Sequence, residues 1–436
     1  MVSWEATLIL YGVILVACLV FGVTIGGAMG LVGIIGLTLL SGMQVWNSLA
    51  DIVFNTLTNF TLVSVPLFVL MGEIILKTGL SKKFYEGLSA LLSPVPGTLA
   101  HSNIFGCAIF SALCGSSVAT ALTIGTVALP EMRRRGYDDR LTIGTLTGGG
   151  CLGILIPPSI PMVVYGSMTN ESVIDLFVAG VIPGLILTGL FIVYVALWVA
   201  FNPGRVPRER SIVGVADFFR SALICAPVAG LVLLIFFSMY LGIATPTEAA
   251  ALGCALALLI GLGYGQLTWK LAWEALGQTV VTTCIVFFIT INALFLSFAV
   301  VQAGIGRGIA AAMVNSGVSA FVFFCMLYVF YLILGMFLDG LSLMLLTVPI
   351  IYPAMVGMGF NGVWLGIIMV VFIELGALTP PMGLNLFAIQ SISRGTSLKD
   401  IAMSSMPYAL IISAFSFFLY FFPQVVLFLP AMMRAN

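Results

Sequence analysis

Long apolar runs, separated by short polar or Gly/Pro-rich segments, fill the chain and predict membrane-spanning helices. A helix needs about 20 mostly apolar residues to cross the hydrocarbon core of a bilayer. The runs of suitable length and apolarity lie at 4–20, 22–40, 52–76, 141–169, 172–200, 221–240, 248–265, 277–300, 362–393 and 402–429.

Two other apolar regions have a different form. Residues 98–113 and 117–131 are helical stretches of about 15 residues, or about 23 Å, which is shorter than a bilayer core of about 30 Å. Polar residues 114–117 join them, and residues 338–340 join a similar pair at 318–337 and 341–356. Both regions predict re-entrant hairpins, whose irregular tips must be covered by protein or line a wet cavity.

The chain also matches itself when it is shifted by 223 positions. Ser116 then falls on Asp339, Gly153 on Gly376, and the Pro-Pro pair at 157–158 on the pair at 380–381. The predicted fold class is therefore an all-α polytopic membrane protein built from two repeats. The predicted divisions are a first repeat at 1–200, a connector at 201–220 and a second repeat at 221–436, with hairpins at 98–131 and 318–356 and broken helices at 141–169 and 362–393.

Composition supports a membrane protein and excludes several classes of function. Hydrophobic residues make up 61% of the 436 residues and charged residues only 7%, far below the quarter typical of soluble domains. The net charge of zero argues against a nucleic-acid partner. The eight cysteines lie in apolar runs as packing residues, and His101, the only histidine, excludes a multi-histidine metal site.

The distribution of Lys and Arg predicts the orientation. Basic residues cluster at 77–83, 133–140, 205–220 and 394–399, and the positive-inside rule places these loops in the cytoplasm. The N-terminus is then outside, the run at 8–20 is a first span and not a signal peptide, and the two repeats are inverted. Arg307 and Arg434 are exceptions on the outer side.

The two Pro-Pro pairs predict breaks in helices at membrane depth. Pro157 and Pro380 lack backbone N–H groups and disfavour helical geometry in the preceding residue, which frees carbonyl groups one turn earlier. Free carbonyls are costly in an apolar slab unless they bind a cation such as Na⁺. The prolines could instead merely kink two helices, but a hairpin upstream of both breaks favours ion sites.

Both hairpin tips carry polar residues. At the first tip the hydroxyls of Ser116, Ser117 and Thr120, with the N–H groups that open the second helix, could hold a carboxylate. At the second tip, Asp339 is an acid far from any predicted interface, which makes it a functional candidate. Helix packing for the serines and helix capping for Asp339 are the structural alternatives.

Three further acids have less certain roles. Glu73 lies four residues before Lys77 and fits a structural pair, and Glu248 fits a helix start. Glu374, two residues before Gly376, could support an ion site or carry a proton, and the sequence leaves both open.

Several strings together resemble the large membrane subunit of tripartite ATP-independent periplasmic (TRAP) transporters. They are GSSVAT at 115–120, LPEM at 129–132, RRGY at 134–137, GILIPPSIP at 153–161, ATPTEAA at 244–250, GMFLDG at 335–340 and TPPMGLN at 379–385. The resemblance implies a Na⁺-driven importer of organic acids in the bacterial inner membrane, with no cofactor beyond the coupling ion. It further implies an elevator mechanism, a small membrane subunit of about four spans and a periplasmic substrate-binding protein as partners.

The same resemblance assigns the sites. One Na⁺ would lie between the first tip and the first break, at Gly115, Ser116, Gly153, Ile156 and Pro158. A second would lie between the second tip and the second break, at Asp339, Gly340, Gly376, Thr379 and Met382. The substrate would lie between the tips, at Ser116, Ser117, Thr120, Ser159, Asp339 and Asn385.

Other classes of membrane protein remain as alternatives. An ion or proton antiporter of similar build, with Asp339 or Glu374 as proton carrier, would need no binding protein. A channel would need a continuous polar stripe, and an enzyme would need a nucleophile and base pair, and neither is evident. The substrate stays open among dicarboxylates, sialic acids, sugar acids and keto acids.

Overall fold

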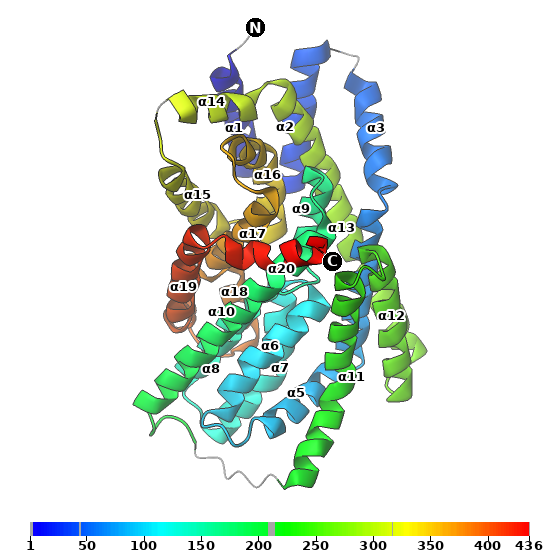
Figure 1. Ribbon diagram of the computed structural model, residues 1–436, viewed down its shortest axis with the longest axis vertical. Coiled ribbons are helices and arrows are strands. Elements are labelled where there is room, and N and C mark those ends of the chain that lie inside the picture. The colour runs from blue at the N-terminus through cyan, green and yellow to red at the C-terminus, as the bar shows by residue number, and fades with distance from the viewer. Residues whose placement is uncertain (1–2, 43–44, 208–213, 316, 436) are drawn as a thin grey trace.

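The computed structural model describes residues 3–42, 45–207, 214–315 and 317–435, which fold as helices joined by turns and short loops (Figure 1). The helices of the first half are α1 (Trp4–Val20), α2 (Ile25–Ser41), α3 (Val45–Leu57), the short 3₁₀ helix η2 (Thr61–Val63), α4 (Ser64–Lys77), α5 (Leu80–Leu91), α6 (Thr98–Cys114), α7 (Ser117–Arg135), α8 (Asp139–Gly150), α9 (Ile160–Thr169) and α10 (Val173–Phe201). Those of the second half are α11 (Val215–Tyr240), α12 (Pro246–Gly263), α13 (Trp269–Gln302), α14 (Ile305–Asn315), α15 (Ala320–Gly335), α16 (Gly340–Gly357), α17 (Gly362–Leu378), α18 (Leu384–Ile392), α19 (Leu398–Phe421) and α20 (Gln424–Ala435).

Side-chain caps fix where many of these helices begin. A capping side chain accepts a hydrogen bond from a backbone N–H that the first helical turn leaves without a partner. Ser172 caps α10 in this way, and Ser319 caps α15. Thr245 and Glu248 form a capping box at the start of α12, so the interpretation of Glu248 as helix-start chemistry is confirmed.

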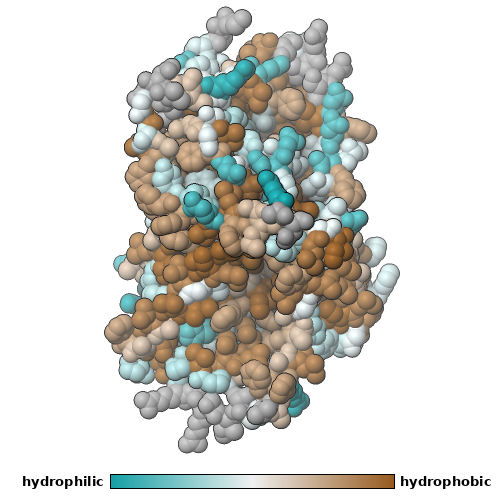
Figure 2. Space-filling view, viewed as in Figure 1, coloured by the Kyte–Doolittle hydropathy of each residue, from teal (hydrophilic) through white to brown (hydrophobic). Residues whose placement is uncertain are grey.

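Six described helices are individually long and apolar enough to cross a membrane: α10, α11, α12, α13, α16 and α19. The predicted crossings at 4–20 and 22–40 form α1 and α2, each 17 residues long. The chain is therefore a multi-pass membrane protein. Brown apolar residues cover much of the lower part of the face shown in Figure 2.

Two predicted crossings differ in the structure. Residues 52–76 are not one helix, because the chain bends by 54° between 49–57 and 61–77. The side chain of Asn59 accepts hydrogen bonds from the backbone N–H groups of Thr61 and Leu62 and so stabilises the bend. The predicted crossing at 402–429 is present as α19, which is long and apolar enough to span, but it ends earlier, at Phe421, and α20 runs across the middle of the molecule (Figure 1).

The position of α20 explains why Arg434 was an exception to the predicted charge distribution. The Arg434 guanidinium donates a hydrogen bond to Asp175, which is buried in the first turn of α10. A buried carboxylate is costly without a partner, so this ion pair stabilises α20 against α10.

Both segments predicted as hairpins form pairs of helices; their re-entrant course stays a prediction, and α16 is itself long and apolar enough to cross a membrane. The first consists of α6 and α7 and the second of α15 and α16, and they enter from opposite ends of the molecule (Figure 1). Both predicted broken helices are also present, as α8 and α9 in the first repeat and α17 and α18 in the second. The start of α8 at Asp139 and that of α17 at Gly362 differ by the same 223 positions as the sequence repeat.

The sequence pattern missed α5 and α14, which have 12 and 11 residues. Both are amphipathic and too short to span a bilayer, so a search for long apolar runs passes over them. The helix α5 packs on α6 and α11, and α14 packs on α16 and α1.

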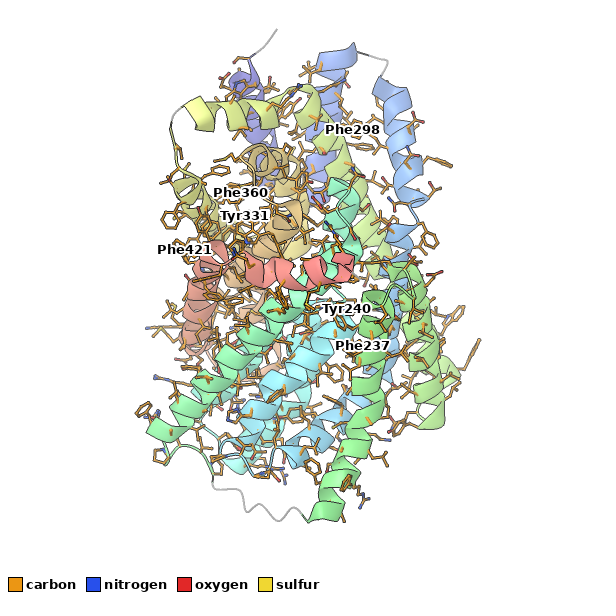
Figure 3. The ribbon with its side chains drawn as sticks, in the orientation of Figure 1. Phe237, Tyr240, Phe298, Tyr331, Phe360 and Phe421 are labelled. Carbon is orange, nitrogen blue, oxygen red and sulfur yellow. The ribbon has the colours of Figure 1, made fainter. Side chains whose placement is uncertain are left out.

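The helices pack as two groups. The scaffold group, α1–α5 with α11–α13, is organised around α13, which packs along α2 and α4. The hairpin group, α6–α9 with α15–α18, is enclosed by α10, α19 and α20. In Figure 3, Tyr331 lies among the packed helices of the second hairpin, where its hydroxyl contacts Thr347, whereas Phe298 and Phe421 are more than half exposed.

Basic loops gather at one end of the molecule. Arg205 lies 3.5 Å from Asp138, and Arg133 donates to Thr396 at 2.9 Å, so three of the predicted cytoplasmic loops are neighbours. The N-terminus lies at the opposite end (Figure 1). This arrangement agrees with the orientation expected from the charge distribution.

Candidate functional site

The first hairpin tip is a tight turn pressed against the first break. Gly115 ends α6 in the left-handed region, with φ of 58°, and Ser116 caps α7 by accepting from the Ala119 N–H. A Cβ atom on Gly115 would lie 3.3 Å from the Pro158 carbonyl oxygen. Glycine therefore serves both the turn and the close approach.

The first break lies between the end of α8 at Gly150 and the start of α9 at Ile160. Gly153 contacts the hairpin so closely that a Cβ would lie 2.5 Å from Cα of Ser117. The carbonyls of Gly153 and Ile154 have no helical donor four residues later, because those positions are Pro157 and Pro158. The break thus holds backbone oxygens directly against the hairpin tip.

The second hairpin and the second break repeat this arrangement. A Cβ on Gly376 would lie 2.6 Å from Cα of Gly335, at the end of α15. Pro380 and Pro381 similarly deprive the carbonyls of Gly376 and Ala377 of helical donors four residues later, although the Gly376 carbonyl accepts from the Thr379 N–H. Each tip therefore packs on the break of its own repeat.

Asp339 caps α16, accepting a 3.0 Å hydrogen bond from the Ser342 N–H. The capping alternative considered from the sequence is therefore present. A cap uses only part of the hydrogen-bonding capacity of a carboxylate, so capping does not exclude a second role. Asp339 is partly exposed and lies at the edge of two cavities.

One of these cavities lies between the two tips and has a volume of about 220 Å³. Both repeats line it, and α13 of the scaffold group closes one side. The lining residues are Gly115, Ser116, Ser117, Val118, Ile154, Ile160, Pro161, Thr282, Val286, Asp339, Gly340, Leu341, Ile373, Glu374, Ala377, Leu384 and Asn385.

The ionisable side chains in the described lining are all acidic. Asp339 and Glu374 contribute carboxyl groups, whereas the described lining contains no Lys, Arg or His. The helices α7 and α16 begin at the cavity, and helix N-termini carry partial positive charge. The cavity therefore offers backbone donors to an anion and carboxyl oxygens to a cation.

The predicted site residues divide into two sets. Gly115, Ser116, Ser117, Asp339, Gly340 and Asn385 line the cavity, which brings together residues of both repeats. The break residues Gly153, Ile156, Pro158, Gly376, Thr379 and Met382 do not line the cavity, and Met382 is 48% exposed; Thr120 and Ser159 are buried without lining it.

Two features of the cavity were not assigned from the sequence. Thr282 comes from α13 in the scaffold group, and a threonine within an apolar helix carries no recognisable signal. Glu374 is 1% exposed and accepts a hydrogen bond from the Ser117 hydroxyl. Its position next to the second break was visible in the sequence, but its partner was not.

A larger cavity of about 560 Å³ lies away from this site, around His101 and the α5–α6 loop. Proline, valine and alanine form much of its lining. His101 is buried there, which agrees with a structural role for the only histidine.

Comparison with known proteins agrees with this architecture. Residues 12–425 match the family model described as "Tripartite ATP-independent periplasmic transporter, DctM component". The C4-dicarboxylate TRAP transporter large permease protein DctM of Pseudomonas aeruginosa is 33% identical over 92% of this chain and 93% of its own length. The protein of the same description from Rhodobacter capsulatus is 31% identical over 98% of this chain and 99% of its own.

A solved structure shares the fold at low sequence identity. The YdaH transporter of Alcanivorax borkumensis superposes with a TM-score of 0.62, covering 89% of this chain and 91% of that one, at 14% identity. The family model and these two relatives cover nearly the whole chain, and all three are described as transporter components. The chain belongs to the family of DctM components, the large permease subunits of tripartite ATP-independent periplasmic transporters.

Proposed function

We propose that this chain is the large permease subunit of a Na⁺-coupled secondary transporter that imports an organic acid across the bacterial inner membrane. The single observation that supports this proposal best is the cavity between the tips, where two carboxyl groups face helix N-termini with no basic side chain in the described lining. A carboxylate substrate would be repelled there unless cations neutralised the acids first.

Coupling follows from that requirement. Na⁺ bound between each tip and its break would take backbone oxygens freed by the prolines as ligands, and the second ion would also neutralise Asp339. The proposed ligand groups are Gly115, Ser116, Gly153, Ile156 and Pro158 for one ion, and Asp339, Gly340, Gly376, Thr379 and Met382 for the other. Substrate affinity that depends on bound ion is coupling by differential binding.

The substrate would lie between the tips, near Ser116, Ser117, Asp339 and Asn385, which line the cavity; Thr120 and Ser159 do not line it and would act only from behind this lining. C4-dicarboxylates are the first class to test, because the relatives from Pseudomonas aeruginosa and Rhodobacter capsulatus carry that description. A volume of about 220 Å³ equals about seven water molecules at roughly 30 Å³ each, which suits a small acid.

The proposal includes two partners and a moving element. A small membrane subunit and a periplasmic substrate-binding protein would complete the transporter, as the family description "tripartite" implies. The hairpin group would move as a block against the scaffold group in an elevator mechanism. The grouping of the helices supports such a motion, and the contacts of α13 with α16 and of α5 with α6 and α7 lie at the boundary along which the block would slide.

Uptake into proteoliposomes tests the proposal. Liposomes containing this chain and its small subunit would be assayed for uptake of C4-dicarboxylates with an imposed Na⁺ gradient, with and without the binding protein. We expect uptake only when both the Na⁺ gradient and the binding protein are present. Uptake driven by a pH gradient alone, without the binding protein, would instead indicate the stand-alone antiporter.

A further inference from the structure

The carboxyl group of Glu374, in the second repeat, is hydrogen-bonded to residues of the first repeat. Glu374 lies on α17, at the start of the second break, and accepts a hydrogen bond from the Ser117 hydroxyl at the first hairpin tip. The thiol of Cys151 and the backbone amide of Ile154, both from the first break, also face this carboxyl group. Every one of these partners belongs to the opposite repeat.

A second contact places Glu374 near the axis that relates the two repeats. The Cys151 thiol is 3.7 Å from the carbonyl oxygen of Glu374, and the two residues are 223 positions apart, which is the repeat shift. Equivalent positions of two repeats touch each other only near the axis that relates them. Asn385 extends the contact by donating to the Cys151 sulfur at 3.2 Å.

The hydrogen bond between Ser117 and Glu374, called the bridge below, has no symmetry-related equivalent. The position equivalent to Ser117 in the second repeat is Gly340, which has no hydroxyl, and the position equivalent to Glu374 in the first repeat is Cys151. The Ser117–Glu374 hydrogen bond therefore has no counterpart across the axis, and among the described residues it links the first tip to the second break in addition to the packing of α7 on α18.

Both ends of the bridge adjoin the proposed ion sites. Ser117 directly follows Ser116, and Gly153 is packed against its backbone. Glu374 precedes Gly376 by two residues within the same turn of α17. A hydroxyl has one O–H to donate, and Ser117 gives it to Glu374, so in this arrangement the side chain has no donor left for a substrate carboxylate.

We infer that Glu374 is a positioning residue that couples the two proposed Na⁺ sites through its hydrogen bond with Ser117. The inference rests on the proposed function, because it requires both ion sites. When one ion orders the first tip, it holds Ser117 in place. Ser117 then holds the Glu374 carboxyl through their hydrogen bond. The start of the second break is therefore already ordered when the second ion binds. The second ion then binds at a smaller entropic cost, which is positive cooperativity.

The experiment measures thermal stability of the purified full-length chain in nanodiscs while NaCl replaces choline chloride at constant ionic strength. It needs neither substrate nor partners. For the unaltered chain we expect stabilisation by Na⁺ with a Hill coefficient approaching about 2, the number of proposed sites. Ser117→Ala and Glu374→Ala should lower the coefficient to about 1, because each removes the bridge.

The variant Glu374→Gln distinguishes the positioning role of Glu374 from an effect of its negative charge. The carboxamide oxygen still accepts from Ser117, so this variant should keep the steep Na⁺ dependence. Ser111→Ala is the matched control, because Ser111 is also buried on the same hairpin and its hydroxyl donates to the Cys107 carbonyl of its own helix. It should leave the Hill coefficient unchanged.

The possible outcomes distinguish this inference from the proposed function. A steep Na⁺ dependence that survives Ser117→Ala would overturn the bridge while leaving the Na⁺ sites in place. If Glu374→Gln lowers the Hill coefficient as much as Glu374→Ala does, the effect depends on the charge of Glu374, and the positioning role is overturned. No stabilisation of the unaltered chain by Na⁺ would contradict the proposed function itself. If Glu374→Ala does not fold, Ser117→Ala decides the question.

Discussion

The carboxylate of Asp339 serves two purposes that substitution can separate. It caps α16, and in the proposed function it also neutralises a bound Na⁺. Asparagine caps helices about as well as aspartate, whereas alanine costs about 1 kcal/mol of stability. The charge and the cap can therefore be removed one at a time.

We expect Asp339→Asn and Asp339→Ala both to abolish Na⁺-dependent uptake in proteoliposomes. Only Asp339→Ala should also lower the melting temperature, because only it loses the cap. Melting curves recorded without Na⁺ isolate the capping effect. Normal uptake by Asp339→Asn would show that the charge of Asp339 takes no part in transport.

Glu131 provides a prediction of pH dependence outside the membrane. It lies in the last turns of α7 and accepts hydrogen bonds from Arg134 and Arg135, 2.7 Å each, which hold its pKa at about 2, below the usual 4.5. A carboxyl whose pKa is lowered in the folded state stabilises the fold above its unfolded pKa. That contribution is lost as the pH falls toward about 2.

Glu131→Gln should therefore destabilise the chain near pH 7, by only about 0.5 kcal/mol, because both arginines are exposed and water screens the ion pairs. The difference from the unaltered chain should shrink below about pH 4.5. Melting temperatures of both proteins from pH 7 down to pH 3 measure this trend. A difference that grows on acidification would show that these ion pairs do not stabilise the fold.

At the scale of elements, the hairpin tips pack directly against the two breaks, and the proposed ion sites depend on this contact. Glycine permits this approach at Gly153 and Gly376, where any Cβ would overlap the backbone of the neighbouring element. A methyl group at either position must push a tip away from its break and so enlarge the proposed ion site.

Gly153→Ala tests this packing. Its Cβ would lie 2.5 Å from Cα of Ser117, so we expect the apparent affinity for Na⁺ to fall about tenfold or more, which corresponds to about 1.4 kcal/mol. Na⁺-dependent thermal stabilisation measures the change. Gly189→Ala on α10 is the control, because nothing lies within 4 Å of its added Cβ. Equal Na⁺ affinity in the two variants would contradict the proposed site.

At the scale of the whole molecule, the elevator proposal requires the hairpin group to slide along the scaffold group. Few polar contacts hold the two groups together at their described boundary. One of them joins Asn59, at the bend between α3 and α4, to Ser167 on α9, with 3.3 Å between the amide nitrogen and the hydroxyl oxygen. The two side chains face each other across the boundary, so a covalent link between positions 59 and 167 would join the two groups.

A disulfide in the double variant Asn59→Cys with Ser167→Cys should therefore stop the motion. We expect oxidation to abolish uptake and a reducing agent to restore it, while Na⁺-dependent thermal stabilisation persists in both states. Each single variant controls for pairing with the native cysteines, of which Cys284 is exposed. Unchanged uptake after complete cross-linking would rule out sliding at this boundary.

The sequence alone determined the local architecture of the site. The hairpins, the two breaks and the glycines and serines at the first tip all follow from features that act within a few residues: prolines without N–H groups, apolar runs too short to span, and turns that require glycine. The repeat was also predicted from the sequence, and its shift of 223 positions recurs between the starts of α8 and α17.

Tertiary structure decided which of these local features meet. Glu374 was recognisable as an unusual acid, but its bond to Ser117 joins residues 257 positions apart and depends on how two hairpins and two broken helices pack. The same holds for Arg434, whose pairing with Asp175 keeps α20 against α10. Hydrophobic patterning determines which segments form helices and where they break. Contacts between distant helices depend on the packing of many side chains at once, which no local pattern encodes.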